Sequence, residues 1–482
     1  MTTYNRNWKY KKRPATLNQS LAGVWSMFTG LKTQNDFSSC FLEGIITETH
    51  ELVKLKEFLD WKKINWIYRD SFPKAKNKSR PGASSKHTDL AVGLILLKQI
   101  YKMSDRALIR AVHENMAIMR FCSVSPMDIQ RNRAEGKRGL MNHTTLVAIR
   151  KRMGKKNLKK IEREFFQQIR KKGLVKGKTL IVDTTSLEKK ILYPTEVNLL
   201  KRIIEHAEMV VQGVIRKKDL VKSAVIKAAN KLAKVYYSAK HKTTELLNAI
   251  SGKMVVLARQ TMAKAGKAAG KASGLKRVIL EKIHRKVREI GGKILEQIES
   301  KLAGKKVSDK IVSYYEPHVR ALPKGKIHKP CEFGTKATIA MSGNGFVTDY
   351  DLHTGNPNEK SLLPAIVKRH ARKFGEDFKQ LTADAEFADS QQTKEMEDKY
   401  GITAGIPEKK GKGVNRGMER KQKRVYDKRS AIEAKISEGK RVHGLDKSDY
   451  EGLEGDWICL ILGAFALNAK KIMRILSPPL EA

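Results

Sequence analysis

Two aspartates stand at positions from which a protein could use them for catalysis. Asp183 follows a short, mostly apolar and β-branched run, Thr179–Val182, and Asp384 follows a second expected strand, at residues 378–383. A buried strand that delivers an acidic residue at its C-terminal end is a common way to place a catalytic carboxylate. Taken alone, the first run favours a plain strand followed by a capping aspartate, so the catalytic interpretation needs further residues.

A third carboxylate belongs to a basic helix expected from about residue 425. Its spacing puts four side chains along one helical stripe: Tyr426, Arg429, Glu433 and Lys440. Such a face could hold a divalent cation at the carboxylate while the phenol, guanidinium and ammonium groups bind phosphate oxygens. Gly439 predicts a helix end just before Lys440. The alternative is a solvated helix with ordinary surface ion pairs.

Strands and helices in alternation are expected to position these groups. Lys336–Met341 and Phe346–Asp351 flank a Ser-Gly-Asn-Gly turn and predict a β-hairpin, and residues 401–407 predict another short buried strand. Helices with apolar stripes are expected after the hairpin, from about residue 425, and after Gly455. The order predicts an α/β domain over residues 176–200 and 311–482, interrupted after its first strand.

The interruption is a lysine-rich segment, residues 201–310. It contains no proline, and Ala, Lys, Leu and Ile dominate it. This composition predicts long basic helices in an antiparallel hairpin or a small bundle. The segment either grips phosphates or serves as a solvated helical spacer, and both readings stay open.

Two further regions precede the α/β domain. Residues 1–85 mix aromatic and basic side chains and end in a loop rich in Pro, Gly, Ser and Lys, Ser71–Lys86. Residues 86–175 predict helices that begin near residues 88, 104 and 144. Short helices in tandem with exposed basic residues could form a helix-turn-helix DNA reader or an ordinary helical packing domain.

The charge of the chain indicates its partner. The 482 residues include Lys+Arg 97 and Asp+Glu 50, a formal net charge of +47, with 40% hydrophobic residues. This hydrophobic content excludes wholesale disorder. So large a positive surplus repels itself unless it meets a polyanion, and nucleic acid is therefore the first partner to consider. Solubility alone is the weaker explanation because acidic residues serve it better.

Cysteine use and hydropathy predict a cytoplasmic protein without a membrane segment. The four cysteines lie far apart and form no Cys-x-x-Cys pair, which argues against a disulfide framework and a zinc finger. Met1 to Arg13 is polar and basic, unlike a secretory signal. The most apolar stretch, Trp457 to Ala469, is too short to span a bilayer.

The motifs together resemble those of bacterial insertion-sequence transposases of the DDE type. The helix stripe Tyr426-x2-Arg429-x3-Glu433-x6-Lys440 resembles the helix signature of that family, and residues 182–185 (VDTT) and 382–387 (TADAEF) resemble its two aspartate motifs. Further similar segments are SYYEP at residues 313–317, EFGTK at 332–336, GN at 355–356, and the helical stretch at 90–121. The likeness covers most of the chain, but neither the lysine-rich segment nor the first 85 residues.

This resemblance implies an RNase H-like catalytic domain with a long helical insertion, preceded by a helical domain. It implies that Asp183, Asp384 and Glu433 are catalytic and bind two divalent ions, Mg²⁺ or Mn²⁺, because oxygen ligands favour these hard cations. Tyr426, Arg429 and Lys440 would contact DNA. Two metals can activate the nucleophile and stabilise the leaving oxygen of a phosphodiester. Many relatives carry their insertion between the second aspartate and the glutamate, so its place here departs from the better-known pattern.

The family likeness also implies partners and a location. The expected substrates are terminal inverted repeats and target DNA, bound by a homodimer that assembles on DNA in the cytoplasm, at the nucleoid. One rival is an inactive or domesticated relative that binds DNA without cutting it. A second rival is a basic RNA-binding protein, which would prefer structured RNA and be indifferent to divalent metal.

Overall fold

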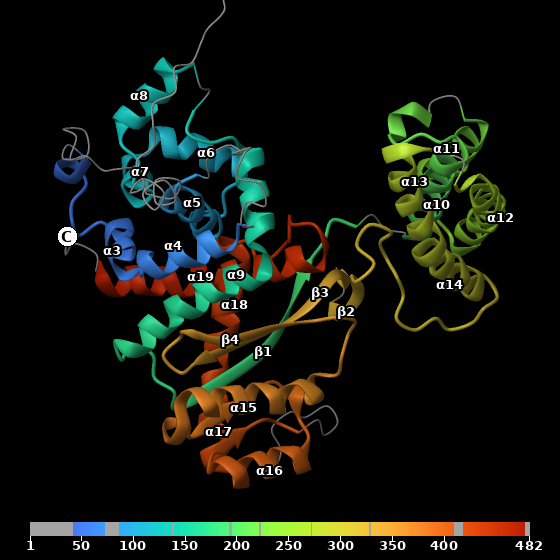
Figure 1. The fold of residues 1–482 in the computed structure, drawn as a ribbon. Helices are drawn as coiled ribbons and strands as arrows, with labels where there is room; N and C mark the ends of the chain where they lie inside the picture. The colour runs from blue at the N-terminus through green and yellow to red at the C-terminus, as the bar shows by residue number, and fades with distance from the viewer. Residues whose placement is uncertain are drawn as a thin grey trace, which may run out of the picture. The chain divides into compact units, whose positions relative to one another are not determined.

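The computed structural model describes most of the chain after residue 41 (Figure 1). The described residues are 42–72, 86–136, 139–191, 195–220, 223–270, 272–326, 329–408 and 418–477. They fall into two compact units, Met1–Gln168 with Ala469–Ala482, and Ile169–Asn468. The aromatic and basic residues before residue 42 and most of the predicted Ser71–Lys86 loop lie outside the described residues. The finer domain division made from the sequence stays a prediction.

The first unit is helical. Its helices are α3 (Glu51–Phe58), α4 (Trp61–Asp70), α5 (Thr88–Ile100), α6 (Asp105–Glu114), α7 (Met116–Phe121), α8 (Pro126–Ala134) and most of α9 (His143–Lys171). The predicted starts near residues 88, 104 and 144 are confirmed. Ser104 caps α6 by accepting a hydrogen bond from the Ala107 backbone N–H at 3.1 Å. Helix α9 is interrupted at Gly154, where φ is +60°. Whether one of these helices reads DNA bases stays a prediction.

The second unit is built on a mixed sheet. Its strands within the described residues are β1 (Thr179–Glu188), β2 (Arg320–Lys326), β3 (Lys329–Ser342), β4 (Val347–His353), β5 (Gln380–Thr382) and β6 (Thr403–Gly405). The order is β2-β3-β1-β5-β6, and β4 pairs with the second half of β3. Strand β1 is antiparallel to β3 but parallel to β5, which is parallel to β6. The predicted α/β class and the hairpin are confirmed.

Alternate residues of β1 face two different helical layers. Leu180 and Val182 pack with Leu363 and Ile366 of α15 (Leu363–Phe374) on one face. Ile181 packs on the other face with Met341 of β3 and with Ile432 of α18 (Ser430–Val442). Because successive strand residues point to opposite faces, Asp183 shares the face of Ile181 and therefore of α18.

The first predicted strand is longer than expected, and Asp183 lies inside it rather than at its end. Beyond Asp183, the strand continues to pair with β3 as far as Glu188 opposite Gly334. Of the polar residues that suggested an end, Thr184 is half-buried and donates to Glu359, and Thr185 is buried; Ser186, just beyond them, is buried and donates to Glu332. Buried polar groups with partners are tolerated in a strand, so the loss of apolar character did not mark its end.

The basic helix also runs further than expected. It comprises α17 (Arg420–Tyr426), a turn of 3-10 helix (Asp427–Arg429) and α18, which ends only at Val442. The prediction that Gly439 stops the helix is wrong. Gly439 is buried, and a Cβ atom there would come within 2.9 Å of Leu445 Cδ1. The glycine therefore serves close packing and does not end the helix.

The lysine-rich segment forms a helical bundle, as predicted, but its first helix begins at Thr195, before the predicted bound at residue 201. Its helices are α10 (Thr195–Val211), α11 (Ala224–Ser238), α12 (Thr244–Ala268), α13 (Gly274–Lys286) and α14 (Gly292–Leu302). A core of Ile203 and Ile204 from α10, Met254 and Ala258 from α12 and Ile294 from α14 holds these three helices together. A short stretch that contains Ala269 and Gly270 separates α12 from α13.

A buried polar network joins the two ends of this insertion. Lys189, which precedes the insertion, lies 2.7 Å from Asp456 of α19 (Gly452–Leu476) and 3.7 Å from Glu316, which follows it. His318 Nε2 lies 2.9 Å from the same aspartate. Burial would raise the pKa of Asp456, but the hydrogen bonds from His318 and Lys189 hold it below its usual value. The network thus fastens the start and the end of the insertion to α19.

Within the described ranges, no helix is both long and apolar enough to cross a membrane.

Candidate functional site

Three carboxylates from distant parts of the second unit meet at one guanidinium group. Arg429 Nη2 lies 3.6 Å from Asp183 Oδ2 and 3.3 Å from Asp384 Oδ2. Its Nη1 lies 2.8 Å from Glu433 Oε1. The structure therefore brings together the two predicted aspartates, the predicted glutamate and one predicted basic residue.

The sheet register explains why the two aspartates are neighbours. Ile181 of β1 pairs with Thr382 of the parallel strand β5, and each aspartate lies two residues beyond this pair. Parallel neighbours advance together, so the two carboxylates reach the same level of the sheet. Asp384 also caps a short 3-10 helix, accepting from the Ala385 backbone N–H at 2.6 Å.

Helix α18 supplies the glutamate. Glu433 lies in its first turn, next to Ile432, which anchors the helix on the sheet. Arg429, one turn earlier, reaches Glu433 as an i,i+4 pair. Exposure increases outward from the sheet, since the side chain of Asp183 is 15% exposed, that of Asp384 36% and that of Glu433 58%. The cluster thus opens to solvent on the α18 side.

The two remaining members of the predicted stripe lie at the margins of this cluster. Tyr426 is half-buried at the end of α17 and contributes to the electrostatic field at Arg429. Lys440 lies seven residues beyond Glu433, about 10 Å further along the helix axis. The structure therefore brings Arg429 and Glu433 to the aspartates, and places Lys440 further along the same helix.

The electrostatics of the site centre on Asp183. Burial raises its pKa to about 6, although Arg429 and the Thr184 backbone N–H act in the opposite direction. The carboxylates of Asp384 and Glu359 raise it further. A bound cation would stabilise the charged form of Asp183, because its positive charge would offset both the burial of the carboxylate and its repulsion by the neighbouring acids. The site is therefore suited to accept a cation.

Arg429 is the cation that neutralises these acids in the structure. Burial would lower its pKa, but the three carboxylates raise it above its ordinary value. Its Nε atom is buried and has no hydrogen-bond partner among the described residues. The guanidinium is therefore held by ion pairs on one side only, which leaves part of its donor capacity unused.

The donor set suits a hard divalent cation, although the carboxylates as they stand do not form a closed metal site. All three contribute oxygen atoms, the ligands that Mg²⁺ and Mn²⁺ prefer. Within the described residues, no group of three His, Cys, Asp or Glu side chains is placed to hold a metal ion together. Each carboxylate instead forms an ion pair with Arg429 through one oxygen. The guanidinium thus supplies the positive charge that balances the three acids.

Sequence reasoning missed two residues beside the cluster. Glu359 accepts a hydrogen bond from Thr184 Oγ1 at 2.8 Å, and its Oε1 lies 3.1 Å from Lys336 Nζ. Lys336 also donates to the Pro357 carbonyl at 3.0 Å. The sequence did contain a signal for these two residues, because Lys336 ends the family-like EFGTK segment and Glu359 follows the family-like GN segment. The distance of these segments from Asp183 along the chain, however, does not indicate that they lie beside it in the fold.

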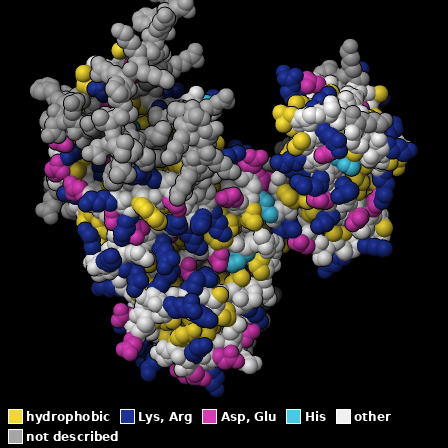
Figure 2. All heavy atoms as spheres, in the orientation of Figure 1, with side chains coloured by type: hydrophobic (Ala, Val, Ile, Leu, Met, Phe, Trp, Pro, Cys, Tyr) yellow, Lys and Arg dark blue, Asp and Glu magenta, His cyan; other side chains and the backbone are white. Residues whose placement is uncertain are grey.

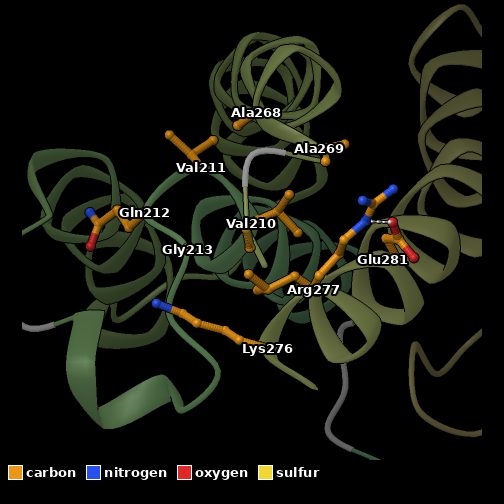
Figure 3. A pocket seen from close by; sticks show the side chains of 12 residues that line it. Val210, Val211, Gln212, Gly213, Ala268, Ala269, Lys276, Arg277 and Glu281 are labelled. Atoms are coloured by element: carbon orange, nitrogen blue, oxygen red, sulfur yellow. Dashed lines mark hydrogen bonds and ion pairs between the residues drawn. The ribbon is translucent and has the colours of Figure 1, made fainter. Parts of the chain in front are cut away.

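A separate cavity in the insertion does not offer comparable chemistry. It measures about 260 Å³ and lies between the end of α10 and the junction of α12 with α13 (Figure 3). Val210, Val211 and Ala268 line one part of it, and its carboxylate among the described residues, Glu281, is paired with Arg277 at 2.7 Å. The lining therefore lacks a group of acids that could act together.

Basic side chains are spread over the face of the insertion that Figure 2 shows, among hydrophobic and acidic ones. Helix α11 illustrates the pattern, since it contains no acidic residue and exposes Lys227, Lys231 and Lys234. Their spacing puts them along one stripe. Such a stripe is suited to a phosphate backbone.

Comparison with known families gives two matches. Residues 41–134 match the family model described as a transposase domain (DUF772), and residues 317–469 match the model described as a transposase DDE domain. No curated protein and no solved structure matches the chain. The second match includes Asp384, Arg429 and Glu433, whereas Asp183 precedes it.

Proposed function

Since the chain belongs to the insertion-sequence transposases of the DDE type, we propose that Asp183, Asp384 and Glu433 are its catalytic carboxylates. A transposase cleaves and joins DNA strands, and the DDE domain, an RNase H-like fold, depends on divalent metal and binds DNA. The observation that supports the assignment is the meeting of these three side chains at Arg429, within 3.6 Å of its guanidinium.

The three carboxylates would hold two Mg²⁺ or Mn²⁺ ions. Such a pair, when bound, activates the attacking hydroxyl and stabilises the leaving oxygen. The Thr184 backbone N–H donates to Asp183 Oδ1 at 2.7 Å and orients the carboxylate. The Ala385 backbone N–H does the same for Asp384. These bonds leave the second oxygen of each aspartate facing Arg429 and the open side of the cluster.

Arg429 has two tasks in this proposal. It neutralises the three acids before metal and DNA arrive. Once they are bound, its planar donor group is suited to bind a DNA phosphate beside the scissile bond. Tyr426 and Lys440, on the same helical stripe, would contact the DNA backbone on either side of it.

The expected substrates are the terminal inverted repeats of the element and a target DNA. Two ends must be cut and joined together, which a homodimer assembled on DNA would accomplish with one site per end. The nucleoid, in a reducing cytoplasm, is where such a protein would act. The basic insertion would add phosphate contacts through the exposed lysines of α11.

The assignment is tested by removing one carboxylate at a time. We expect Asp183→Asn, Asp384→Asn and Glu433→Gln each to reduce Mg²⁺-dependent cleavage of terminal-repeat DNA by about a thousandfold or more. DNA binding in EDTA should persist. Glu386→Gln is the matched control, because Glu386 belongs to the same motif as Asp384 but is exposed. Full cleavage by the Asp183→Asn protein would refute the proposed site.

A further inference from the structure

A hollow lined by cations and an exposed indole lies on the first unit, between α4 and α9. It measures about 430 Å³, within the range of about 300–1,000 Å³ in which ligand pockets fall. Trp66 lies in its lining and is 65% exposed. An indole left so open is unusual, because a large aromatic side chain gains free energy from burial.

The surroundings of the indole are positively charged. Lys62 and Arg163 line the same hollow and are exposed. Lys160 Nζ lies 5.8 Å from the centroid of the Trp66 ring and also pairs with Asp70 at 3.3 Å. An aromatic face with basic side chains around it is suited to a flat, neutral ring system that is linked to negatively charged phosphates.

The acidic residue of the lining does not cancel this charge. Glu164 is bound by Lys63 at 2.6 Å, and this pair neutralises itself. Lys62 and Arg163 form no ion pair with a carboxylate among the described residues, so their charges remain available. Lys62 and Trp66 lie one turn apart on α4, as Lys160 and Arg163 do on α9, and the two helices therefore present one continuous basic and aromatic surface.

We propose that this hollow binds single-stranded DNA, with an unpaired base stacked on Trp66 and the flanking phosphates held by Lys62 and Arg163. Base stacking on an aromatic side chain tolerates any sequence, and the two cations follow the backbone rather than the base edges. The site is distinct from the carboxylate cluster. It rests on DNA being the partner of this family and not on the identity of the catalytic residues.

The test measures binding of the full-length protein to a fluorescein-labelled oligothymidylate in EDTA, by fluorescence anisotropy. Trp66→Ala should weaken this binding about tenfold, whereas Trp66→Phe should retain most of it because phenylalanine keeps a stacking ring. Met127→Ala, an exposed apolar residue of the same unit, is the matched control and should bind as wild type does. Affinity for a random-sequence duplex should change less than about twofold in each variant.

The charges are tested separately through salt. A Lys62→Ala, Arg163→Ala double variant should lower the slope of log affinity against log salt by about 1.4 for the single strand. Oligothymidylate should also quench tryptophan emission in the wild type and quench it less in Trp66→Phe, which covers the case that Trp66→Ala does not fold.

Three results would overturn the proposal: wild-type affinity of the Trp66→Ala protein for the single strand, an equal loss of duplex binding, or tighter binding of oligouridylate than of oligothymidylate. Because no divalent metal is present, these results leave the assignment of Asp183, Asp384 and Glu433 untouched. Conversely, loss of the catalytic assignment would not alter the binding expected here.

Discussion

At the scale of single residues, Arg429 decides how the carboxylate cluster behaves without metal. Three acids share this guanidinium, so removing it leaves like charges close together. The same acids should then bind a divalent cation more readily, since the protein's own cation no longer competes.

Arg429→Gln should therefore lower the stability of the protein in EDTA by about 1–3 kcal/mol, because partly buried acids lose their partner. Added Mg²⁺ should raise the unfolding temperature of the variant more than that of the wild type. Scanning fluorimetry with and without Mg²⁺ measures both effects. Arg372→Gln, at an exposed site on α15, is the control. An equal response of both proteins to Mg²⁺ would contradict the competition.

His370 makes stability depend on pH. It is fully buried, its Nε2 lies 2.9 Å from the Gly177 carbonyl, and burial lowers its pKa to about 4. The unfolded chain, with an ordinary pKa near 6.5, binds this proton more readily. Stability should therefore fall as pH drops from about 6.5 towards 4, by up to about 3 kcal/mol. Thermal unfolding across this range should show a weaker dependence in His370→Gln, and an unchanged dependence would exclude His370 as the cause.

The spacing of residues revealed part of this site and concealed the rest. Arg429 and Glu433 lie one helical turn apart, so their pairing follows from the sequence. The two aspartates each follow an apolar run, and their motifs resemble those of a known family. The bond between Thr184 and Glu359, by contrast, spans 175 residues. No local sequence pattern predicts such a contact, because it depends on how β3 and the segment after it fold back onto β1.

At the scale of elements, strands and helices with a clear period were predictable, and their ends were not. The β-hairpin and α15 follow from apolar spacing and turn residues, and the insertion helices follow from a composition rich in Ala, Lys, Leu and Ile without proline. The end of β1 and the effect of Gly439 were misjudged for the same physical reason. Tertiary contacts override local preference there, since buried polar groups find partners in β1 and a glycine allows close packing in α18.

The pairing of β1 with β3 depends on a glycine at its far end. A Cβ atom at Gly334 would come within 2.2 Å of the Leu187 carbonyl oxygen, a backbone atom that cannot move alone. Gly334→Ala should thus lower the free energy of unfolding by about 1–3 kcal/mol. Gly252→Ala in α12, where no atom lies within 4 Å of the added Cβ, should instead stabilise by about 0.5–1 kcal/mol. Denaturant titrations compare the two, and a neutral Gly334→Ala would show that the strands can separate without cost.

At the scale of the whole molecule, charge governs how the protein meets DNA. The net charge of +47 predicts an affinity for duplex DNA that falls steeply with salt. Both matched family models describe transposases, which agrees with DNA as the polyanion and gives no support to the RNA-binding alternative.

Replacing Lys227, Lys231 and Lys234 of α11 with alanine should reduce the slope of log affinity against log salt by about 2–3 for a duplex of any sequence. Nitrocellulose filter binding over a salt series measures this slope. Lys394 and Lys399 of α16 (Ser390–Tyr400) are the control, since acidic residues accompany them on that helix. An unchanged slope in the α11 variant would identify the insertion as a spacer.

The network of Lys189, Glu316 and Asp456 has a consequence for how this protein could be dissected. Lys189, before the insertion, and Glu316, after it, belong to one ion-pair network. The chain therefore enters and leaves the helical bundle at the same place. Replacing the insertion with a short flexible linker at this place should give a protein whose sheet still folds. Its activity would show what the catalytic domain does without the lysine-rich bundle.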